Sequence, residues 1–401
     1  MMSRQIQEAY IVAATRLPVG RRKGMLGHVR PDDMLAHAIR SVMAQASGLD
    51  PALVGDVIVG CAMPEAEQGM NVARIGLLLA GLPNMVPGVT VNRFCASGLQ
   101  AVAMAADRIR LGEAEVMIAA GCETMSLMNQ IVGNKMAINP AIFEKEENYA
   151  IGFGMGITAE KVAARWQVSR EDQDAFALAS HQKACAAIAA GHFQGEISPY
   201  PVTARVPDLQ SGDVKVREYL AENDEGPRAD SSREGLARLR PAFSGQGSVT
   251  AGNSSQMSDG AAAVLLVSEK ALQQFDLKPM ARFAGFSVAG VAPEIMGIGP
   301  IEAIPRVLAQ AGVGQDEVDW FELNEAFAAQ ALAVMRTLDL DPVKVNPLGG
   351  AIALGHPLGA TGAIRTATLV HGLRRTRQRY GMVSMCIGTG MGAAGLFESI
   401  A

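Results

Sequence analysis

Short apolar runs alternate with amphipathic segments through the first 127 residues. The apolar runs predict strands at 9–14, 55–61, 87–91 and 115–120. The amphipathic segments predict helices that begin at Pro31, at Val72 and just after Gly98. Strands that alternate with helices are typical of an α/β fold with a largely parallel or mixed central sheet.

The pattern changes after Met125 and returns near residue 260. A capping-box-like start at Ser169 predicts a helix to about 190, whereas 199–250 shows little periodicity. We interpret this stretch as an insertion. The sequence therefore divides into a first half at 1–127 plus 258–278, an inserted loop domain at 128–257, and a second half at 279–401.

The second half repeats the order of the first. Strands are expected at 281–288, 319–323, 380–386 and 395–397, and helices at 301–311 and 326–338. A helix that opens near Gly98 leads into strand 115–120, and one that opens near His356 leads into strand 380–386. This echo suggests a duplication in which each half gives one helix start to a shared centre.

Composition narrows the class of protein. The chain has 401 residues, is 49% apolar and carries a net charge of -5, with no basic block to favour nucleic acid. Five widely spaced cysteines form no disulfide framework or metal-ligand pair, which favours a reducing, cytoplasmic setting. The start lacks an apolar signal core, and the long uncharged stretches contain Gly or Pro, so we expect no membrane span.

A lone cysteine, Cys95, lies between the strand ending at 91 and the following helix. A turn of this kind points its apical side chain outward and places it near free N–H groups, which favours a thiolate. The functional interpretation is a nucleophile. From this stretch alone, a buried structural role for Cys95 is an equally good interpretation.

Three further clusters follow predicted strands or lie among glycines: Asn324 after a buried strand, His356 in a Gly-rich loop, and Cys386 before the Gly388 loop. Histidine is the usual base for a cysteine nucleophile, and the other five histidines (28, 37, 181, 192 and 371) have ordinary structural or solvated contexts. A second thiol of intermediate pKa can move a proton at carbon, and an asparagine can support an oxyanion. Each cluster alone could be structural; together they indicate an active site.

At these clusters the chain resembles the thiolases. The matching segments, in family order, are 92–98, 121–126, 250–255, 324–327, 355–357 and 386–388, and the resemblance covers 10–398. It implies a five-layered αβαβα fold with an inserted loop domain, and dimers or dimers of dimers.

The resemblance also implies a reaction, the reversible cleavage of 3-ketoacyl-CoA by CoA. His356 would take the proton of Cys95, whose thiolate attacks the keto carbon, and Cys386 would protonate the acetyl-CoA enolate. One oxyanion hole would use His356 and a water on Asn324; the other would use the N–H groups of Cys95 and Gly388.

Coenzyme A is expected as a co-substrate, with no permanently bound cofactor and no metal. Arg228, Ser255 and Met155 would contact it. Gly154 stands where acetoacetyl-CoA-specialised thiolases often have His, and Gly235 where they have Ser. These departures favour a degradative enzyme of fatty-acid β-oxidation with a broader chain length.

Several alternatives stay open. A decarboxylating condensing enzyme would lack the second catalytic cysteine, and a non-catalytic CoA- or lipid-binding relative would have lost at least one of Cys95, His356 and Cys386. An acetoacetyl-CoA or 3-oxoadipyl-CoA thiolase remains compatible with the sequence. A complex with a β-oxidation hydratase/dehydrogenase subunit is a further expected partnership.

Overall fold

The computed structural model describes residues 6–128 and 138–400. The first five residues, part of the predicted signal-free start, and positions 129–137 of the predicted insertion lie outside the described residues, as does position 401. No helix within the described ranges is long and apolar enough to span a membrane.

One sheet organises the molecule. Ten strands among the described residues form it, in the order β10-β11-β12-β9-β1-β8-β5-β3-β4, with β2 paired to β8. The first-half strands are β1 (Ala9–Arg16), β2 (Gly20–Arg21), β3 (Val57–Gly60), β4 (Gly88–Val91), β5 (Val116–Thr124) and β8 (Ser258–Ser268). The second-half strands are β9 (Ala281–Gly290), β10 (Val318–Leu323), β11 (Tyr380–Ile387) and β12 (Met391–Ser399).

The two halves of the sheet meet only briefly, where Tyr10 of β1 lies opposite Arg282 of β9. Strand β3 runs parallel to β4 and β5, and β10 runs parallel to β11, whereas the other neighbours in the path are antiparallel. The sheet is therefore mixed, as predicted. The parallel strands require crossover helices, which explains the alternation of strands and helices along the chain.

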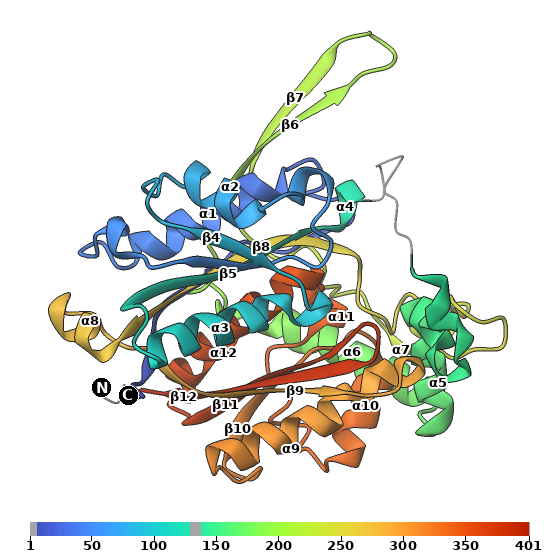
Figure 1. The fold of residues 1–401 in the computed structure, drawn as a ribbon. Coiled ribbons are helices and arrows are strands. Elements are labelled where there is room, and N and C mark those ends of the chain that lie inside the picture. Colours follow the sequence, from blue (N-terminus) through green and yellow to red (C-terminus); the bar gives the residue numbers. More distant parts are fainter. Residues whose placement is uncertain (1–5, 129–137, 401) are drawn as a thin grey trace.

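Helices form three layers around the two half-sheets (Figure 1). Helices α1 (Pro31–Ala44) and α2 (Val72–Leu79) cover the outer face of the first half, and α9 (Gly299–Ala311) and α10 (Ala328–Thr337) cover that of the second. Helices α3 (Ser97–Arg110) and α12 (Thr361–Thr376) lie between the half-sheets, and most of their residues are buried. The predicted five-layered arrangement is confirmed.

The starts of α3 and α12 touch through glycines. A Cβ atom on Gly362 would lie 2.0 Å from the backbone nitrogen of Leu99, and one on Gly98 would lie 2.7 Å from that of Ala363. Because any side chain would collide with backbone, only glycine permits this approach. Each half thus supplies one helix start to the shared centre, as the sequence predicts.

The segment between β5 and β8 contains more regular structure than the sequence suggests. Its helices and strands are α4 (Met125–Met128), α5 (Met155–Arg165), α6 (Arg170–Ala189), β6 (Tyr200–Pro207), β7 (Val214–Ala221) and α7 (Arg233–Ala237), with 3-10 turns η4 (Pro140–Glu144) and η5 (Glu146–Gly152). The expectation of an inserted loop region without strands at 199–250 is wrong for β6 and β7, which form an antiparallel hairpin.

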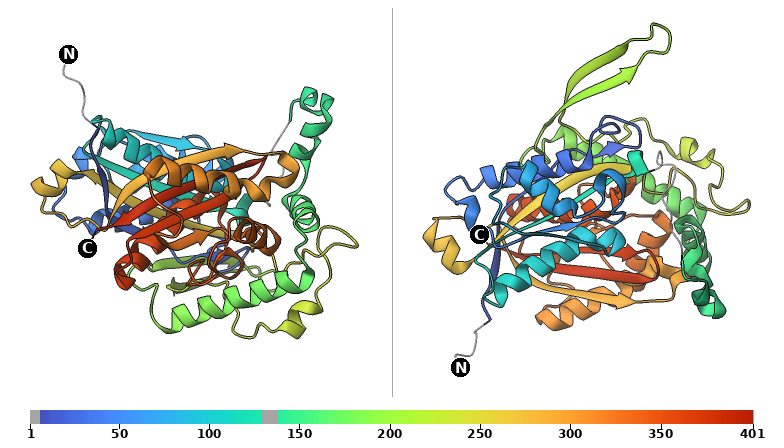
Figure 2. Two further views of the ribbon diagram at one scale, coloured as in Figure 1. Left: turned by 90° about the horizontal axis from the view of Figure 1, so that it is seen from below. Right: turned by 45° about the horizontal axis from the view of Figure 1, so that its top comes forward.

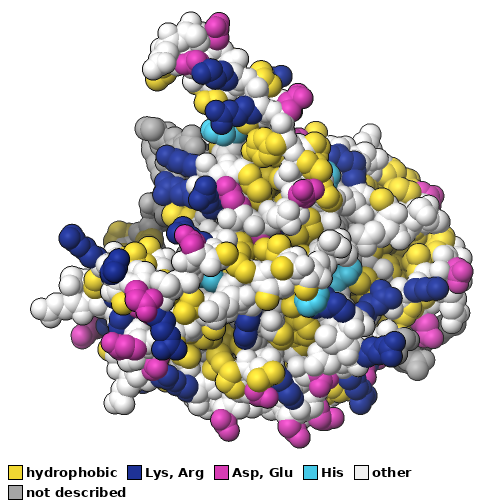
Figure 3. All heavy atoms as spheres, turned by 180° about the vertical axis from the view of Figure 1, so that it is seen from behind, with side chains coloured by type: hydrophobic (Ala, Val, Ile, Leu, Met, Phe, Trp, Pro, Cys, Tyr) yellow, Lys and Arg dark blue, Asp and Glu magenta, His cyan; other side chains and the backbone are white. Residues whose placement is uncertain are grey.

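This hairpin projects from the body (Figures 1 and 2). Most of its side chains are exposed, and its buried apolar positions are limited to Val202, Ala204 and Ala221. Seen from behind, it stands clear of the body and mixes Lys and Arg with Asp, Glu and hydrophobic side chains (Figure 3).

The remaining short elements are η1 (Pro51–Leu53), η2 (Ala66–Gln68), η3 (Phe94–Ala96), α8 (Glu269–Gln274), η6 (Pro293–Ile298), α11 (Ala351–Leu354) and η7 (Leu358–Ala360).

Candidate active site

Cys95 occupies a fixed turn between β4 and α3. Phe94, just before it, has a left-handed φ of 45°, which is strained for a non-glycine residue and makes the turn sharp. The Asn92 Oδ1 accepts from the Phe94 N–H (2.8 Å), and the Ser97 hydroxyl donates to the Phe94 carbonyl (2.7 Å). The hydrogen bonds of these neighbours therefore hold the cysteine at the start of the buried helix.

The electrostatics of Cys95 correct one prediction. The N–H groups of Gly388 and of Cys95 itself lie where they stabilise a thiolate, but burial outweighs them and raises the pKa of Cys95 to about 11. The buried carboxylate of Glu123 acts in the same direction as burial. Burial therefore opposes the expected shift toward thiolate, and Cys95 begins as a neutral thiol that needs a base.

Cys386 lies at the end of β11 and is almost fully buried. Burial raises its pKa well above the ordinary range, and charge on Cys95 raises it further, which places the two thiols close enough to interact. A raised pKa keeps the proton on this sulfur, which suits a group that donates a proton to carbon.

Gly388 and Met155 complete the wall beside the thiols. A Cβ atom on Gly388 would lie 3.5 Å from Met155 Sδ, so the thioether covers the loop that contributes the Gly388 N–H. Gly154, at the start of α5, has open space where a side chain would stand. Gly154 is exposed, so the position where the sequence departs from the acetoacetyl-CoA pattern opens to solvent beside Met155.

His356 is buried, and hydrogen bonds hold its backbone nitrogen and its Nδ1 atom. Its N–H donates to the Ser258 hydroxyl (3.1 Å), and its Nδ1 lies 2.6 Å from Thr361 Oγ1. The Thr361 hydroxyl donates its one hydrogen to the Pro357 carbonyl (3.2 Å), so Thr361 accepts from Nδ1–H. We assign the neutral ring with Nε2 unprotonated. Burial, and then the positive charge of Arg365, lower the pKa of His356 to about 3.

Asn324 lies beside Nε2, the unprotonated ring nitrogen of His356. Its Nδ2 is 3.3 Å from His356 Nε2, and its backbone N–H donates to the Ser384 carbonyl (2.8 Å). Its Oδ1 is buried without a partner among the described residues. A buried amide oxygen without a partner is costly unless water or a ligand meets it, so Asn324 can hold a water at this point.

The structure thus brings the predicted catalytic residues together in two contacts. In one, η3, which contains Cys95, packs against β11, which contains Cys386, and Cys95 lies beside the Gly388 N–H; Asn324 with His356 forms the other. In the described part of the chain no hydrogen bond joins Cys95 to His356. However, η3, which contains Cys95, packs against η7, which follows His356. Hydrogen bonds of this kind often tighten only when substrate binds.

Two buried carboxylates tie these loops together, and sequence reasoning gave neither a role. The Glu123 Oε2 accepts from the N–H groups of Ala62 and Gly359, both at 2.8 Å. Glu325 accepts from the hydroxyl of Ser180 at 2.7 Å. Glu123 and Glu325 each stand inside a matched motif, but only the fold shows which loops they join.

The predicted coenzyme contacts are placed separately. Arg228 lines a pocket of about 320 Å³ together with His181 and Gln256, whereas Ser255 lies just outside its lining, with its N–H bonded to Ala326 O (2.9 Å). His181 Nδ1 accepts from the Arg228 N–H (3.2 Å). His181 is therefore a buried residue of the pocket wall that fixes the backbone at Arg228.

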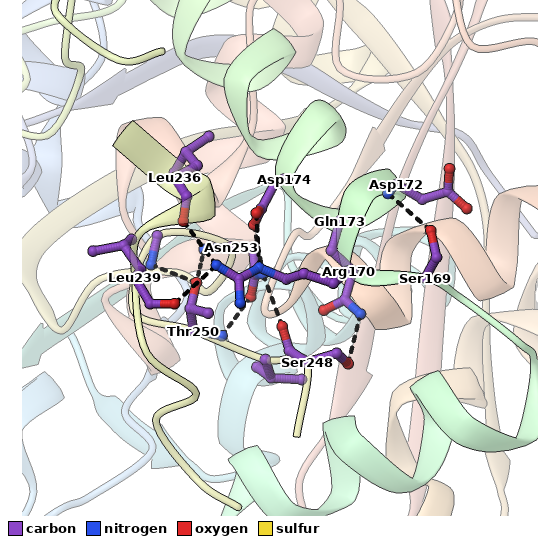
Figure 4. Close-up of polar contacts among 12 residues, drawn as sticks. Ser169, Arg170, Asp172, Gln173, Asp174, Leu236, Leu239, Ser248, Thr250 and Asn253 are labelled. Carbon is purple, nitrogen blue, oxygen red and sulfur yellow. Dashed lines mark hydrogen bonds and ion pairs between the residues drawn. The ribbon is translucent and has the colours of Figure 1, made fainter. Parts of the chain in front are cut away.

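A polar network holds the wall of this pocket against α6 (Figure 4). Asp174 accepts from Arg170 Nε (2.7 Å) and from Asn253 Nδ2 (2.9 Å). Arg170 Nη2 donates to the carbonyls of Leu236 (2.7 Å) and Leu239 (3.0 Å), two residues that line the pocket. The first turn of α6 therefore positions a loop that lies far from it in the sequence.

Two thiols, a neutral imidazole and backbone N–H groups are the groups that acyl transfer through a cysteine thioester requires. Family models described as "Thiolase, N-terminal domain" and "Thiolase, C-terminal domain" match residues 9–270 and 277–399. The chain belongs to the thiolase family and is an acyltransferase.

Relatives and solved structures agree. The chain is 50% identical over 394 residues to the 3-ketoacyl-CoA thiolase of Bacillus subtilis (strain 168), covering 98% of this chain and 100% of the relative. It is 48% identical to the peroxisomal 3-ketoacyl-CoA thiolase of Homo sapiens, covering 94% and 87%. The acetyl-CoA acetyltransferase structure from Bacillus anthracis is similar with a TM-score of 0.89 and 39% identity, covering 99% and 100%.

Proposed function

We propose that this protein cleaves 3-ketoacyl-CoA with CoA to give acyl-CoA and acetyl-CoA, in fatty-acid β-oxidation. The observation that carries the proposal is the pairing of Cys95, supported by the Gly388 N–H, with a second buried thiol, Cys386. A simple cysteine acyltransferase needs one thiol. The second is required when a carbon–carbon bond breaks and the carbanion must be protonated. The names of the Bacillus subtilis and human relatives agree with this substrate.

In the first half-reaction, the Cys95 thiol attacks the keto carbon as His356 Nε2 takes its proton. The tetrahedral oxyanion lies against the N–H groups of Cys95 and Gly388. When the intermediate collapses, the bond between the α and keto carbons breaks and the acyl group stays on Cys95. The acetyl-CoA enolate, held by the water on Asn324 and by the protonated His356, takes its proton from Cys386.

In the second half-reaction, a CoA thiol gives its proton to the Cys386 thiolate and attacks the thioester. Acyl-CoA leaves, and the Cys95 thiolate takes its proton back from the protonated His356. Atoms and charges balance over the two half-reactions, and the protein is neither oxidised nor reduced. We therefore propose CoA as a co-substrate without a resident cofactor, bound along the pocket that contains Arg228, with Ser255 and Met155 nearer the thiols.

The open space at Gly154 supports a broader acyl chain length. Gly154 has an ordinary φ of -62°, so a larger residue could stand there, yet no atom fills the space. Because this position adjoins Met155, which covers the Gly388 loop, an acyl chain can extend there. A histidine in the same place would narrow the pocket.

We also propose a homo-oligomer, a dimer or a tetramer, built from the free edge of β4. This strand ends the sheet, and its outer edge has no partner strand among the described residues. Val89 on it and Met104 on α3 are exposed large apolar side chains. Two such edges can pair across a twofold axis. A cytoplasmic location and a complex with a hydratase/dehydrogenase subunit remain part of this proposal.

The test is CoA-dependent loss of 3-ketoacyl-CoA across chain lengths from acetoacetyl-CoA upward, with 3-oxoadipyl-CoA as a separate substrate. We expect activity on several straight chains and an acyl adduct on Cys95 by mass spectrometry. Cys95→Ser should fold and form no acyl thioester, whereas Cys185→Ser, which changes a thiol on α6, should retain turnover. Activity confined to acetoacetyl-CoA or to the dicarboxylic substrate would refute the proposed substrate class.

A further inference from the structure

A second, larger pocket, of about 690 Å³, lies between the inserted segment and the C-terminal half. It lies between α6 and α10, which pack against each other on the right of Figure 1, and the segment 342–347 closes one side. Pockets of roughly 300–1,000 Å³ are the size that binds small organic ligands. We propose that this pocket binds a fatty carboxylate, an apolar chain of medium length that ends in one carboxylate held by Lys183.

The pocket is separate from the one that contains Arg228. Phe176, Ala179 and Lys183 line it, and they recur at spacings of three and four on α6, so they share one face of that helix. His181, which lines the Arg228 pocket, comes two residues after Ala179 and therefore points about 200° around the helix. The two pockets use opposite faces of α6.

The walls of the pocket favour an alkyl chain. Most of its lining is apolar, and the side chains that provide it are Phe176, Leu332, Met335, Val343, Val345 and Pro347. Val343 is 79% exposed, an uncommon position for a side chain of this kind. A bound hydrocarbon chain would remove part of this surface from water, which is favourable in proportion to the apolar area covered.

Lys183 supplies the polar end. Its Nζ donates to the carbonyl of Val345 (2.9 Å) and more weakly to that of Pro342 (3.5 Å). In the described part of the chain no carboxylate forms an ion pair with it. Burial lowers its pKa despite the charges of Glu325 and Glu322, so the positive charge is incompletely compensated. A ligand carboxylate would complete it.

The other charges of the pocket are already satisfied. Asp172 and Arg336 form an ion pair of 2.7 Å, and the Asp172 carboxylate points away from the Asp174 network (Figure 4). Glu325 is buried and accepts from the Ser180 hydroxyl, the Asn346 amide and the Ile352 N–H. Lys183 is therefore the group left to select an anion, and the apolar walls select an anion with a hydrocarbon chain.

Titration calorimetry with sodium decanoate tests the proposal on the full chain without substrate, so its outcome does not depend on the proposed reaction. We expect one decanoate per chain. Lys183→Met, which keeps an unbranched side chain, should weaken binding by about tenfold or more, because a charge-assisted hydrogen bond contributes ~1.5–3 kcal/mol. Lys161→Met removes an exposed cation on α5 and should leave the affinity unchanged, and methyl decanoate should bind more weakly than decanoate.

Ala179→Phe provides a second, independent variant, because it fills the apolar part of the pocket and leaves Lys183 in place. Ala179→Phe should abolish decanoate binding. It tests the location of the binding site even if Lys183→Met fails to fold. Absence of decanoate binding to the wild type would overturn the proposal. So would equal affinity in wild type and both pocket variants, or displacement of decanoate by saturating CoA, which would place the ligand in the substrate pocket.

Discussion

Replacing Thr361 with valine tests how His356 is prepared to act as a base. Valine has nearly the same shape as threonine but has no hydroxyl, so Thr361→Val removes the 2.6 Å contact to Nδ1 and preserves packing. Thr361 is 1% exposed and His356 is 4% exposed, so water does not readily replace the lost partner. The Nδ1–H of His356 is left buried and unpaired.

The expected loss follows from the state of the imidazole. Removing one partner of a buried hydrogen bond costs about 1–3 kcal/mol of stability. During catalysis His356 takes the proton of Cys95, and its Nδ1–H becomes a charge-assisted donor worth ~1.5–3 kcal/mol. Because the resting enzyme already loses the neutral bond, worth ~0.5–1.5 kcal/mol, only the excess of about 1–1.5 kcal/mol acts on kcat/KM, which at ~1.36 kcal/mol per factor of ten should fall by roughly five- to thirteenfold. The transition state loses more than the resting enzyme does.

The assay compares thiolysis rates and thermal unfolding for wild type, Thr361→Val and Thr361→Ser. Serine restores the hydroxyl, so it should recover most of kcat/KM even if the protein remains less stable. A valine variant with lower stability and an undiminished kcat/KM would refute the tautomer that we assign to His356.

Three further predictions concern other parts of the site. Gly154→His should lower kcat/KM for long acyl chains more than for acetoacetyl-CoA, and a uniform loss across chain lengths would contradict the open space beside Met155. Cys386→Ser should slow hydrogen exchange at the acetyl-CoA methyl group far more than acyl transfer to Cys95, as measured by NMR and by trapping; equal losses would contradict its role as proton donor. Because the folded pKa of His356 is about 3 and the unfolded value is near 6.5, its contribution to stability is full above pH 6.5 and declines as the pH falls toward 3. Between pH 7.5 and pH 5.5 the free energy of unfolding should therefore fall by about 1.4 kcal/mol more in the wild type than in His356→Gln. Denaturant titrations measure this difference, and parallel pH profiles of the two proteins would contradict it.

The candidate catalytic positions could be proposed from the sequence because each lies in a short local signal. Cys95 stands between an apolar run and a helix-forming run, and His356 lies among glycines. The alternation of strands and helices likewise predicted the mixed sheet. The domain boundaries at 127, 257 and 278 remain a prediction; β5 ends at Thr124 and β8 begins at Ser258.

Properties set by distant contacts could not be predicted. The pKa values of Cys95 and Cys386 depend on burial by segments hundreds of residues away, and this burial outweighs the nearby N–H groups that the sequence pattern suggests. His181 becomes a pocket residue only because Arg228, 47 positions later, lies against it. The β6–β7 hairpin was missed because neither of its faces is consistently buried.

The contact between Gly98 and Gly362 has a consequence for how this enzyme can change. The nucleophile belongs to the first half of the chain and the base to the second, and the helices that orient them meet backbone to backbone. The alignment of the two helices therefore depends on the absence of a side chain at both glycines. It does not depend on two packed side chains that could be replaced one at a time. A mutation that adds even one carbon at either glycine would shift both reactive groups together, so the two halves cannot diverge independently at this point, however freely their outer surfaces vary.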